Sequence, residues 1–366
     1  MNITLPAAVF ADAVSTVSRA LSAKPTMPVL EGILLMAEES KLTVSATDLS
    51  LGIEQEVSAE VKKPGAVALQ GRLLLELARK LPPGDVTISV VDKTAKVVCH
   101  DSRFTLAVLS AEEFPRMPQE KTAAPLEFSC SSLKGFINKV IFSVSSEESR
   151  PGLSGCLFEK KDGTLTMVAL DISRMAMVEE DREGADFSAI IPGRALGEIV
   201  KILPDEGTVS VCFSEAHGYF KTDSTQIQTR LLSGDFTRYR ALIPAGYKTR
   251  VELPAALFRD CLERVSVLSR ETANHMALIS FVENKMSMSS KSQSGDAHEE
   301  LLINFSGEPL DICFNAKLLL EMLRVIGNQS IVLTFTSPLA PCTVAAADRD
   351  TWLYLLMPMR MPESIG

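Results

Sequence analysis

The chain has 366 residues, enough for two or three domains, and its 46% hydrophobic and 23% charged residues are ordinary for a globular protein with sizeable cores. Its net charge of -9 argues against non-specific nucleic-acid binding by the surface as a whole. No apolar stretch approaches the ~20 residues that span a bilayer, and the N-terminus lacks the basic region of a signal peptide. Composition therefore predicts a cytoplasmic globular protein.

The cysteines also indicate a reducing compartment. Seven cysteines are scattered singly, without a CxxC pair or a histidine at ligand spacing. An odd number, mostly flanked by apolar residues, is typical of reduced core thiols. We expect neither a metal nor a cofactor.

One helical segment occurs three times along the chain. "LPAAVFADAVSTVSRALS" begins at Leu5, "SCSSLKGFINKVIFSVSS" at Ser129 and "LPAALFRDCLERVSVLSR" at Leu253. Their apolar residues coincide and recur at i, i+4 and i+8, for example Val9, Ala13 and Val17 in the first copy. This pattern predicts three equivalent amphipathic helices.

A second repeated segment runs from a short strand through a polar turn into a helix. Its copies are "VALQGRLLLELARKL" at 67–81, "AIIPGRALGEIVKIL" at 189–203 and "ICFNAKLLLEMLRVI" at 312–326. Each helix carries a base at its start, an acid four residues later and then a second base. These residues are Arg72, Glu76 and Arg79, then Arg194, Glu198 and Lys201, then Lys317, Glu321 and Arg324.

Alternating apolar and polar stretches between these helices predict half-buried strands. Each repeat thus has about 120 residues with two helices packed on an antiparallel sheet, which is α+β in class. Pro, Gly and Lys interrupt the pattern near 123–125 and 246–249, where we expect linkers. We predict three domains of one fold, at residues 1–124, 125–249 and 250–366. The expected strands include 41–47, 164–170, 285–291, 85–91, 208–214 and 330–336.

The expected helices are basic in an otherwise acidic chain. They hold 12 basic and 6 acidic residues, whereas the remainder holds 25 basic and 40 acidic residues. Lys and Arg are good helix formers, so this pattern could be structural. The alternative is a positive helical wall that faces a phosphate backbone without reading bases. Aromatic residues are sparse in these helices, which favours a duplex over a single strand.

Seven further motifs are spread over the chain: "KPTMPVLEGILL", "LTVSATDLSL", "AEEFPRMP", "LTMVALDISRMAM", "FTRYRALIP", "FNAKLLLEML" and "YLLMPMRM". With these motifs and the threefold repeat, the sequence resembles the family of the bacterial DNA polymerase III β subunit, the sliding clamps. The resemblance implies the clamp fold and a processivity factor without catalytic activity. It also implies a head-to-tail homodimer, a closed ring around double-stranded DNA with helices inside and sheets outside.

The resemblance further implies a hydrophobic cleft that captures short peptides of DNA polymerases, the clamp loader and repair proteins. Trp352 and Tyr354 are expected in a closing strand, and the residues after them in one wall of the cleft. The cleft residues carried over are Leu153, Leu170, Ile172, Ser173, Arg174, Met175, Thr237, Ala241, Leu242, Asn315, Leu318, Leu339, Pro341, Leu355, Met357, Pro358, Met359 and Arg360.

Twelve basic side chains are expected to face DNA. Ten belong to the expected helices, and Lys24 and Arg150 follow from the resemblance alone. Sliding requires weak, delocalised phosphate contacts, which scattered single bases provide. The residues are Lys24, Arg72, Arg79, Lys80, Lys134, Lys139, Arg150, Arg194, Lys201, Arg264, Lys317 and Arg324.

The sequence departs from the family pattern at several of these positions, so the peptide preference of the cleft and one DNA contact stay open. The extension "MPESIG" passes the usual end of the family, and we expect it to be disordered. The replacements are Ile172, Ser173, Thr237 and Ala241 at the cleft, Pro151 and Gly152 before Leu153, and Lys24 and Glu147 at expected DNA contacts.

Two other interpretations compete with a sliding clamp. For an enzyme, the four histidines are far apart and fit no catalytic or metal motif, and no phosphate-binding GK[ST] loop is present. Asp48 and Asp171 recur at equivalent places, which favours a turn or cap over a pair of catalytic carboxylates. A divergent clamp paralogue, an interaction scaffold with altered partners, remains an open alternative.

Overall fold

The computed structural model describes residues 1–22, 27–117, 125–147, 150–347 and 351–361. Lys24, the start of the first expected linker at 123–124 and the extension after Met361 lie outside these ranges. All six expected helices are present, and the strand pairs of the described residues are antiparallel. The α+β fold class is therefore confirmed.

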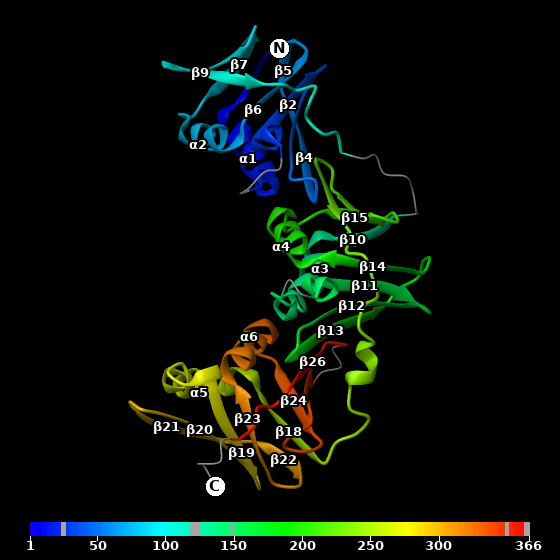
Figure 1. Ribbon diagram of the computed structural model, residues 1–366, viewed down its shortest axis with the longest axis vertical. Coiled ribbons are helices and arrows are strands. Elements are labelled where there is room, and N and C mark those ends of the chain that lie inside the picture. The colour runs from blue at the N-terminus through cyan, green and yellow to red at the C-terminus, as the bar shows by residue number, and fades with distance from the viewer. Residues whose placement is uncertain (23–26, 118–124, 148–149, 348–350, 362–366) are drawn as a thin grey trace. The chain divides into compact units, whose positions relative to one another are not determined.

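In the first repeat, α1 (Ala7–Val17) and α2 (Gly71–Lys80) lie side by side (Figure 1). α1 buries Phe10, Ala13 and Val17, whereas Val9 of the expected stripe is 39% exposed. A strict i, i+4, i+8 spacing drifts around a helix by about 40° per step, so the buried stripe uses i, i+3 and i+7 instead. The other elements are β1 (Asn2–Pro6), η1 (Ser18–Ala20), η2 (Pro28–Glu31), β2 (Gly32–Glu38), β3 (Lys41–Thr47), β4 (Leu51–Ser58), β5 (Glu60–Lys63), β6 (Gly65–Gln70), β7 (Asp85–Val91), β8 (Thr94–Cys99) and β9 (Ser102–Leu109).

The second repeat follows the same order of strand, helix, strands, helix and strands. Its helices are α3 (Cys130–Asn138) and α4 (Gly193–Ile202). α3 is shorter than the helix predicted in the repeated segment that begins at Ser129, because the chain continues as a separate 3-10 turn. The other elements are β10 (Leu126–Ser129), η3 (Ile141–Ser143), η4 (Pro151–Ser154), β11 (Gly155–Lys161), β12 (Thr164–Leu170), β13 (Arg174–Asp181), β14 (Phe187–Pro192), β15 (Thr208–Phe213), β16 (His217–Lys221), β17 (Thr225–Arg230) and η5 (Tyr239–Leu242).

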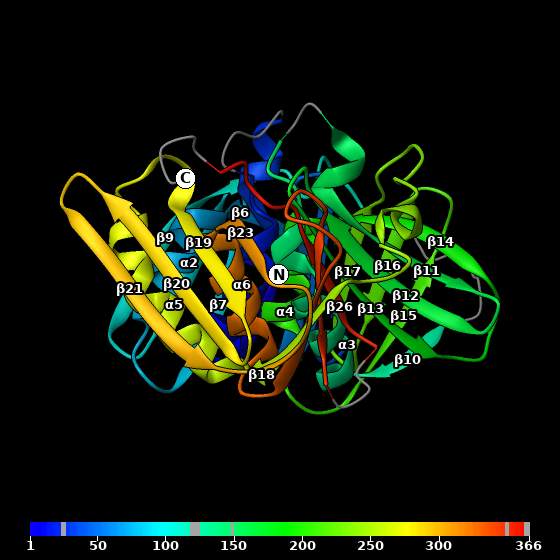
Figure 2. The ribbon, with the colours of Figure 1, turned by 90° about the horizontal axis from the view of Figure 1, so that it is seen from below.

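In the third repeat, α5 (Ala255–Ser269) packs beside α6 (Ala316–Ile326) and covers one face of β20 (Lys285–Ser292) and β21 (Gly295–Leu302) (Figure 2). Phe258 is buried while Leu257 is 48% exposed, the same one-residue shift as in α1. The other elements are β18 (Thr249–Pro254), η6 (Ala273–His275), β19 (Met276–Val282), β22 (Asn304–Gly307), β23 (Leu310–Asn315), β24 (Ser330–Phe335), β25 (Cys342–Ala346) and β26 (Leu353–Leu356).

Strands pair across the repeats as well as within them. β17, the last strand of the second repeat, pairs with β4 of the first and places Thr229 opposite Leu51. β26, the last strand of the third repeat, pairs with β13 of the second and places Leu355 opposite Met175. Each pairing adds a row of backbone hydrogen bonds between neighbouring repeats.

The chain accordingly divides into two compact units that share the second repeat. One unit comprises residues 1–133 with 194–231, and the other comprises residues 134–193 with 232–366. The first holds a 13-stranded sheet that includes β17 and β4. The second holds a nine-stranded sheet that includes β13 and β26, and a four-stranded sheet ordered β21, β20, β19, β23.

The recurring aspartates hold two equivalent turns. Asp48 Oδ1 accepts hydrogen bonds from the backbone N–H groups two and three residues later, at 2.9 and 2.8 Å. Asp171 Oδ1 does the same at 2.7 and 2.9 Å. These side chains replace backbone hydrogen bonds in the turns that precede β4 and β13. The turn interpretation of both residues is confirmed.

All seven cysteines are buried and free. Burial raises the pKa of the Cys156 and Cys342 thiols above their ordinary range, so both stay protonated. Among the described residues, the helices are too short or too polar to cross a membrane.

The turn at Asp48 gives a first prediction. Asp48→Ala removes both turn hydrogen bonds, and we expect it to lower the free energy of unfolding by about 1–2 kcal/mol. Asp48→Asn keeps an acceptor oxygen and should cost less, as measured by urea denaturation. Equal costs for the two variants would contradict a turn-holding role and would point to the carboxylate charge.

Candidate functional site

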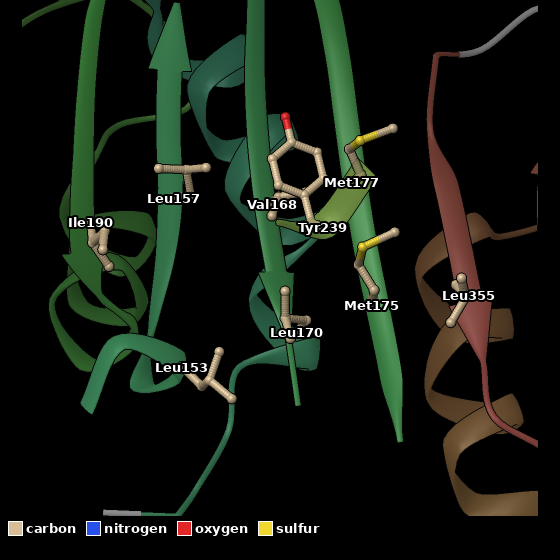
Figure 3. Close-up of a cluster of buried hydrophobic side chains, with 9 residues drawn as sticks. All are labelled: Leu153, Leu157, Val168, Leu170, Met175, Met177, Ile190, Tyr239 and Leu355. Atoms are coloured by element: carbon tan, nitrogen blue, oxygen red, sulfur yellow. The ribbon is translucent and has the colours of Figure 1, made fainter. Parts of the chain in front are cut away.

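An apolar cluster lies where β11, β12, β13 and β26 run side by side. Alternation along each strand places every second side chain on one face, and on this face the side chains are aliphatic groups and thioethers. Figure 3 shows them projecting from these strands, with the Tyr239 ring close to Val168. This β12–β13 cluster consists of Leu153, Leu157, Val168, Leu170, Met175, Met177, Ile190, Tyr239 and Leu355, each at most 8% exposed.

Segments that leave this cluster carry large apolar side chains into solvent. Ile172, two residues beyond Leu170, is 58% exposed, and Leu242 at the end of η5 is 43% exposed. Met357, two residues beyond Leu355, is 40% exposed. Exposed apolar side chains that continue a buried cluster are typical of a docking surface.

Residues 353–359 are held by backbone hydrogen bonds to neighbouring segments. β26 lies between β13 and β25. Beyond it, Met357 N–H donates to Ser173 O at 2.8 Å, and Met359 N–H donates to Cys313 O at 2.8 Å. This tail, residues 353–359, is therefore part of the fold, and the exposed Met357 and half-buried Met359 side chains project from a backbone held by hydrogen bonds.

Arg174 connects the start of β13 to α6. Its Nε donates to Asp171 at 3.0 Å, its Nη1 donates to Glu321, and its guanidinium lies 5.6 Å from the centre of the Phe142 ring. Burial lowers the pKa of this guanidinium, but the hydrogen bond to Glu321 and the two carboxylate charges outweigh burial and raise it. Arg174 therefore stays charged with only 10% of its side chain exposed.

Tyr239 fixes the segment that leads to Leu242. Its hydroxyl donates to Glu159 Oε1 at 2.8 Å, and Phe236 packs edge-on against its ring. Burial, then the hydrogen bond to Glu159, raise the pKa of the phenol above its ordinary range. Tyr239 thus remains a neutral donor and anchors η5 on β11.

The structure brings part of the expected cleft together and gives other members structural roles. Leu153, Leu170, Met175 and Leu355 belong to the β12–β13 cluster. Asn315 caps α6, because its Oδ1 accepts from the N–H groups two and three residues later. The other expected residues are exposed or half-buried: Ile172, Ser173, Thr237, Ala241, Leu242, Leu318, Leu339, Pro341, Met357, Pro358, Met359 and Arg360.

The sequence did not single out five members of this cluster. Val168 and Met177 could have been found from the alternation of their strands, which places them on the same face as Leu170 and Met175. Tyr239 carried no such signal, because it lies in an irregular segment whose position depends on long-range contacts. The five missed residues are Leu157, Val168, Met177, Ile190 and Tyr239.

Several of the cations expected to face DNA are already engaged. Arg194 pairs with Asp48 at 2.6 Å, and Lys201 pairs with Glu198 at 2.8 Å. Burial raises the pKa of Glu198, but hydrogen bonds from Lys201 and Arg19 lower it by more. Arg79 donates to Ser15, Arg264 pairs with Glu299, and Arg324 lies 3.7 Å from Glu263.

The remaining expected cations that the structure describes either are half-buried or have side chains without a partner among the described residues. Lys134 and Lys139, in and after α3, are half-buried. Within the described residues, four expected cations have side chains without a hydrogen bond or ion pair: Arg72, Lys80, Arg150 and Lys317.

A basic pocket of about 310 Å³ lies between α5 and α6. Arg270, His275, Lys317 and Arg324 line it, and none of its lining side chains is acidic. Among the residues that the structure describes, no three His, Cys, Asp or Glu side chains group as metal ligands. The pocket therefore favours an anion as its occupant.

Family models match nearly the whole chain in three consecutive parts. The N-terminal domain of the DNA polymerase III beta subunit matches residues 1–118, the central domain matches 127–238, and the C-terminal domain matches 240–360.

Individual proteins show the same likeness. A beta sliding clamp of Halalkalibacterium halodurans is 31% identical, covering 98% of this chain and all of that protein. The beta sliding clamp of Bacillus subtilis is 28% identical with the same coverage. The crystal structure of the Bacillus subtilis clamp superposes with a TM-score of 0.96 at 27% identity, over 99% of this chain and all of that one. The DNA polymerase III subunit beta of Pseudomonas aeruginosa superposes at 0.93, with 26% identity and the same coverage.

The Arg174 network gives a second prediction. Arg174→Met leaves two carboxylates near each other without their cation, so we expect the free energy of unfolding to fall by about 2–4 kcal/mol. Arg250→Met is the matched control, because it removes a more exposed pair with Glu252 and should cost at most about 1 kcal/mol. Equal decreases in the free energy of unfolding of the two variants, measured by urea denaturation, would show that Arg174 does not stabilise the contact between β13 and α6.

Proposed function

Because this chain belongs to the family of the DNA polymerase III beta subunit, it is a sliding clamp, and we propose which of its surfaces hold its partners. It is a non-catalytic processivity factor that forms a homodimeric ring around double-stranded DNA and binds DNA polymerases. We place it in the cytoplasm. We retain the boundaries 1–124, 125–249 and 250–366 for the three clamp domains, which the positions of the repeats support.

We propose that the cleft residues carried over from the family form the peptide-binding surface. The observation that carries this proposal is the continuity of the buried β12–β13 cluster with the exposed Ile172, Leu242 and Met357. A peptide with leucine and aromatic anchors would bury these side chains and extend the cluster. Methionine thioethers adapt to differently shaped anchors, which suits a surface shared by polymerases, the clamp loader and repair proteins.

We propose that the helices face the DNA. Within the described residues, Lys80 in α2 and Lys317 in α6 are exposed cations without a side-chain partner, so they are available to phosphates. Cations already paired with carboxylates, such as Arg194 and Arg264, contribute less, because a phosphate must compete with the internal partner. Few free charges, widely spaced, support weak contacts that permit sliding.

The same cross-repeat pairing supports a closed ring. β4 and β13 each receive the last strand of the following repeat. Their counterpart in the third repeat, β21, pairs only with β20 among the described strands. β9, the last strand of the first repeat, pairs with β6 only at Ala68 and Leu69, so residues 102–107 have β8 alone as a partner. We propose that β9 of one copy pairs with β21 of the other.

The peptide surface gives a third prediction. Met357→Asp combined with Met359→Asp should weaken binding of a short Leu- and Phe-containing polymerase peptide about 100-fold, because the apolar anchors would meet carboxylates. Isothermal titration calorimetry measures this change. Val282→Asp, at a 49% exposed position on β19, is the control and should bind normally. Undiminished affinity in the double variant would remove the tail from the peptide surface, and loss of the dimer would assign it a structural role instead.

The ring and its charges give a fourth prediction. With a clamp loader and ATP, the protein should become trapped on nicked circular DNA and be released after linearisation. Lys80→Glu with Lys317→Glu should shorten retention as salt rises, with the log–log salt slope of binding reduced by about 1 per lost phosphate contact.

Lys161→Glu with Lys221→Glu makes the same charge change at exposed strand positions and serves as the control. Equal retention of both double variants would exclude Lys80 and Lys317 from the DNA path. Failure of the unaltered protein to load would favour a divergent paralogue that acts as an interaction scaffold.

A further inference from the structure

Among the described residues, the base and the acid at the start of the second helix both have partners in α4, and the acid alone has one in α6. In α4, Arg194 pairs with Asp48 at 2.6 Å, and Glu198 pairs with Arg19 at 2.9 Å. Both partners belong to the preceding, first repeat. In α6, Glu321 pairs with Arg174 of the preceding, second repeat.

The same two positions in α2 are unpaired. Arg72 and Glu76 are exposed, and within the described residues neither side chain makes a hydrogen bond or an ion pair. They lie four residues apart, one turn of the helix, on a common face. α2 belongs to the first repeat. In a head-to-tail ring, the third repeat of a second copy takes the place of a preceding repeat.

The third repeat supplies a carboxylate where Arg72 would need one. The strands β20 and β21 correspond to β3 and β4, and this register puts Ser292 at the place of Asp48. Ser292 Oγ donates to Glu271 Oε2 at 2.9 Å, which places the carboxylate of Glu271 beside position 292. Glu271 lies just beyond the end of α5.

The same repeat supplies a cation for Glu76. The register of the first helices puts Val267 at the place of Arg19, and Arg270 lies one turn later. Arg270 is therefore displaced along the helix by about one turn, 5.4 Å, from the position equivalent to Arg19, and the length of an arginine side chain can span this displacement. Arg270 is exposed, lines the basic pocket, and makes no side-chain hydrogen bond or ion pair with the described residues.

Apolar groups accompany these charges on both helices. Leu73, next to Arg72, is 45% exposed, and Val267, one turn before Arg270, is 63% exposed. Aliphatic contact beside charge pairs is the usual composition of a protein interface.

We propose that Arg72 and Glu76 of one copy pair with Glu271 and Arg270 of a second copy at each seam of the ring. This assignment rests on the proposed head-to-tail dimer and adds the charges that select its register. It also gives Arg72 a role at the seam, distinct from the DNA-facing role expected from its place in a basic helix.

Two charge reversals test the pairing of Glu76 with Arg270. In a homodimer of Glu76→Arg chains, the substituted residue faces Arg270 of the other chain at both seams, so two arginines meet. In a homodimer of Arg270→Glu chains, the substituted residue faces Glu76 of the other chain, so two glutamates meet. Each homodimer should exchange subunits at least about tenfold faster than the unaltered protein, because like charges replace opposite ones. Exchange between populations labelled with two fluorophores, followed by energy transfer, measures this rate.

Mixing the two variants restores opposite charges at both seams. At one seam the Glu76→Arg substitution of one chain faces the Arg270→Glu substitution of the other, and the remaining seam keeps Glu76 with Arg270. Heterodimers should therefore exceed the statistical one half at equilibrium, and a chain with both substitutions should exchange at nearly the unaltered rate. Arg72→Glu mixed with Glu271→Arg should behave in the same way.

Arg259→Glu is the control on α5, because Arg259 already contacts Asn328 and Asp260 within its own chain. Statistical mixing, or exchange no faster than in this control, would overturn the seam pairs while leaving the ring intact. If the unaltered protein were monomeric at micromolar concentration, the head-to-tail dimer itself would fail, and the seam pairs with it.

Discussion

Backbone hydrogen bonding between strands of different repeats is the interaction on which the architecture depends. The second and third repeats each end in a strand that completes the sheet of the repeat before it, through β17 on β4 and β26 on β13. These rows satisfy donors and acceptors that would otherwise remain at open sheet edges. The Asx turns at Asp48 and Asp171 fix where β4 and β13 begin, and with them the register of both joints.

The local elements could be predicted because their signals are local. The expected strands at 41–47 and 164–170 agree with β3 and β12 to the residue, since turns flank both strands and define their ends. The helices agree within a few residues. The exposure of Val9 and Leu257 was not foreseen, because equal spacing in sequence does not keep residues on one line of a 3.6-residue helix.

The site required information that a single sequence does not hold. The family resemblance named Leu170, Met175 and Leu355, but pairing of β13 with β26 is what gathers them, and that contact spans about half of the chain. Tyr239 lies in a segment without periodicity, so only the tertiary structure reveals its hydrogen bond to Glu159. The internal pairs of Arg194 and Arg264 likewise separate engaged cations from free ones, which net charge alone could not do.

The position of β26 has a mechanical consequence. The strand has a hydrogen-bonded neighbour on each edge, and its exit is held again at Met357 and Met359. A partner bound to the methionine side chains that pulls along the strand would load the hydrogen bonds of β26 with β13 and β25 simultaneously, in shear. Peeling, in which bonds break one after another, would require a force across the sheet. Under the proposed assignment of the peptide surface, traction from a bound polymerase would load the hydrogen bonds on both edges of β26 together.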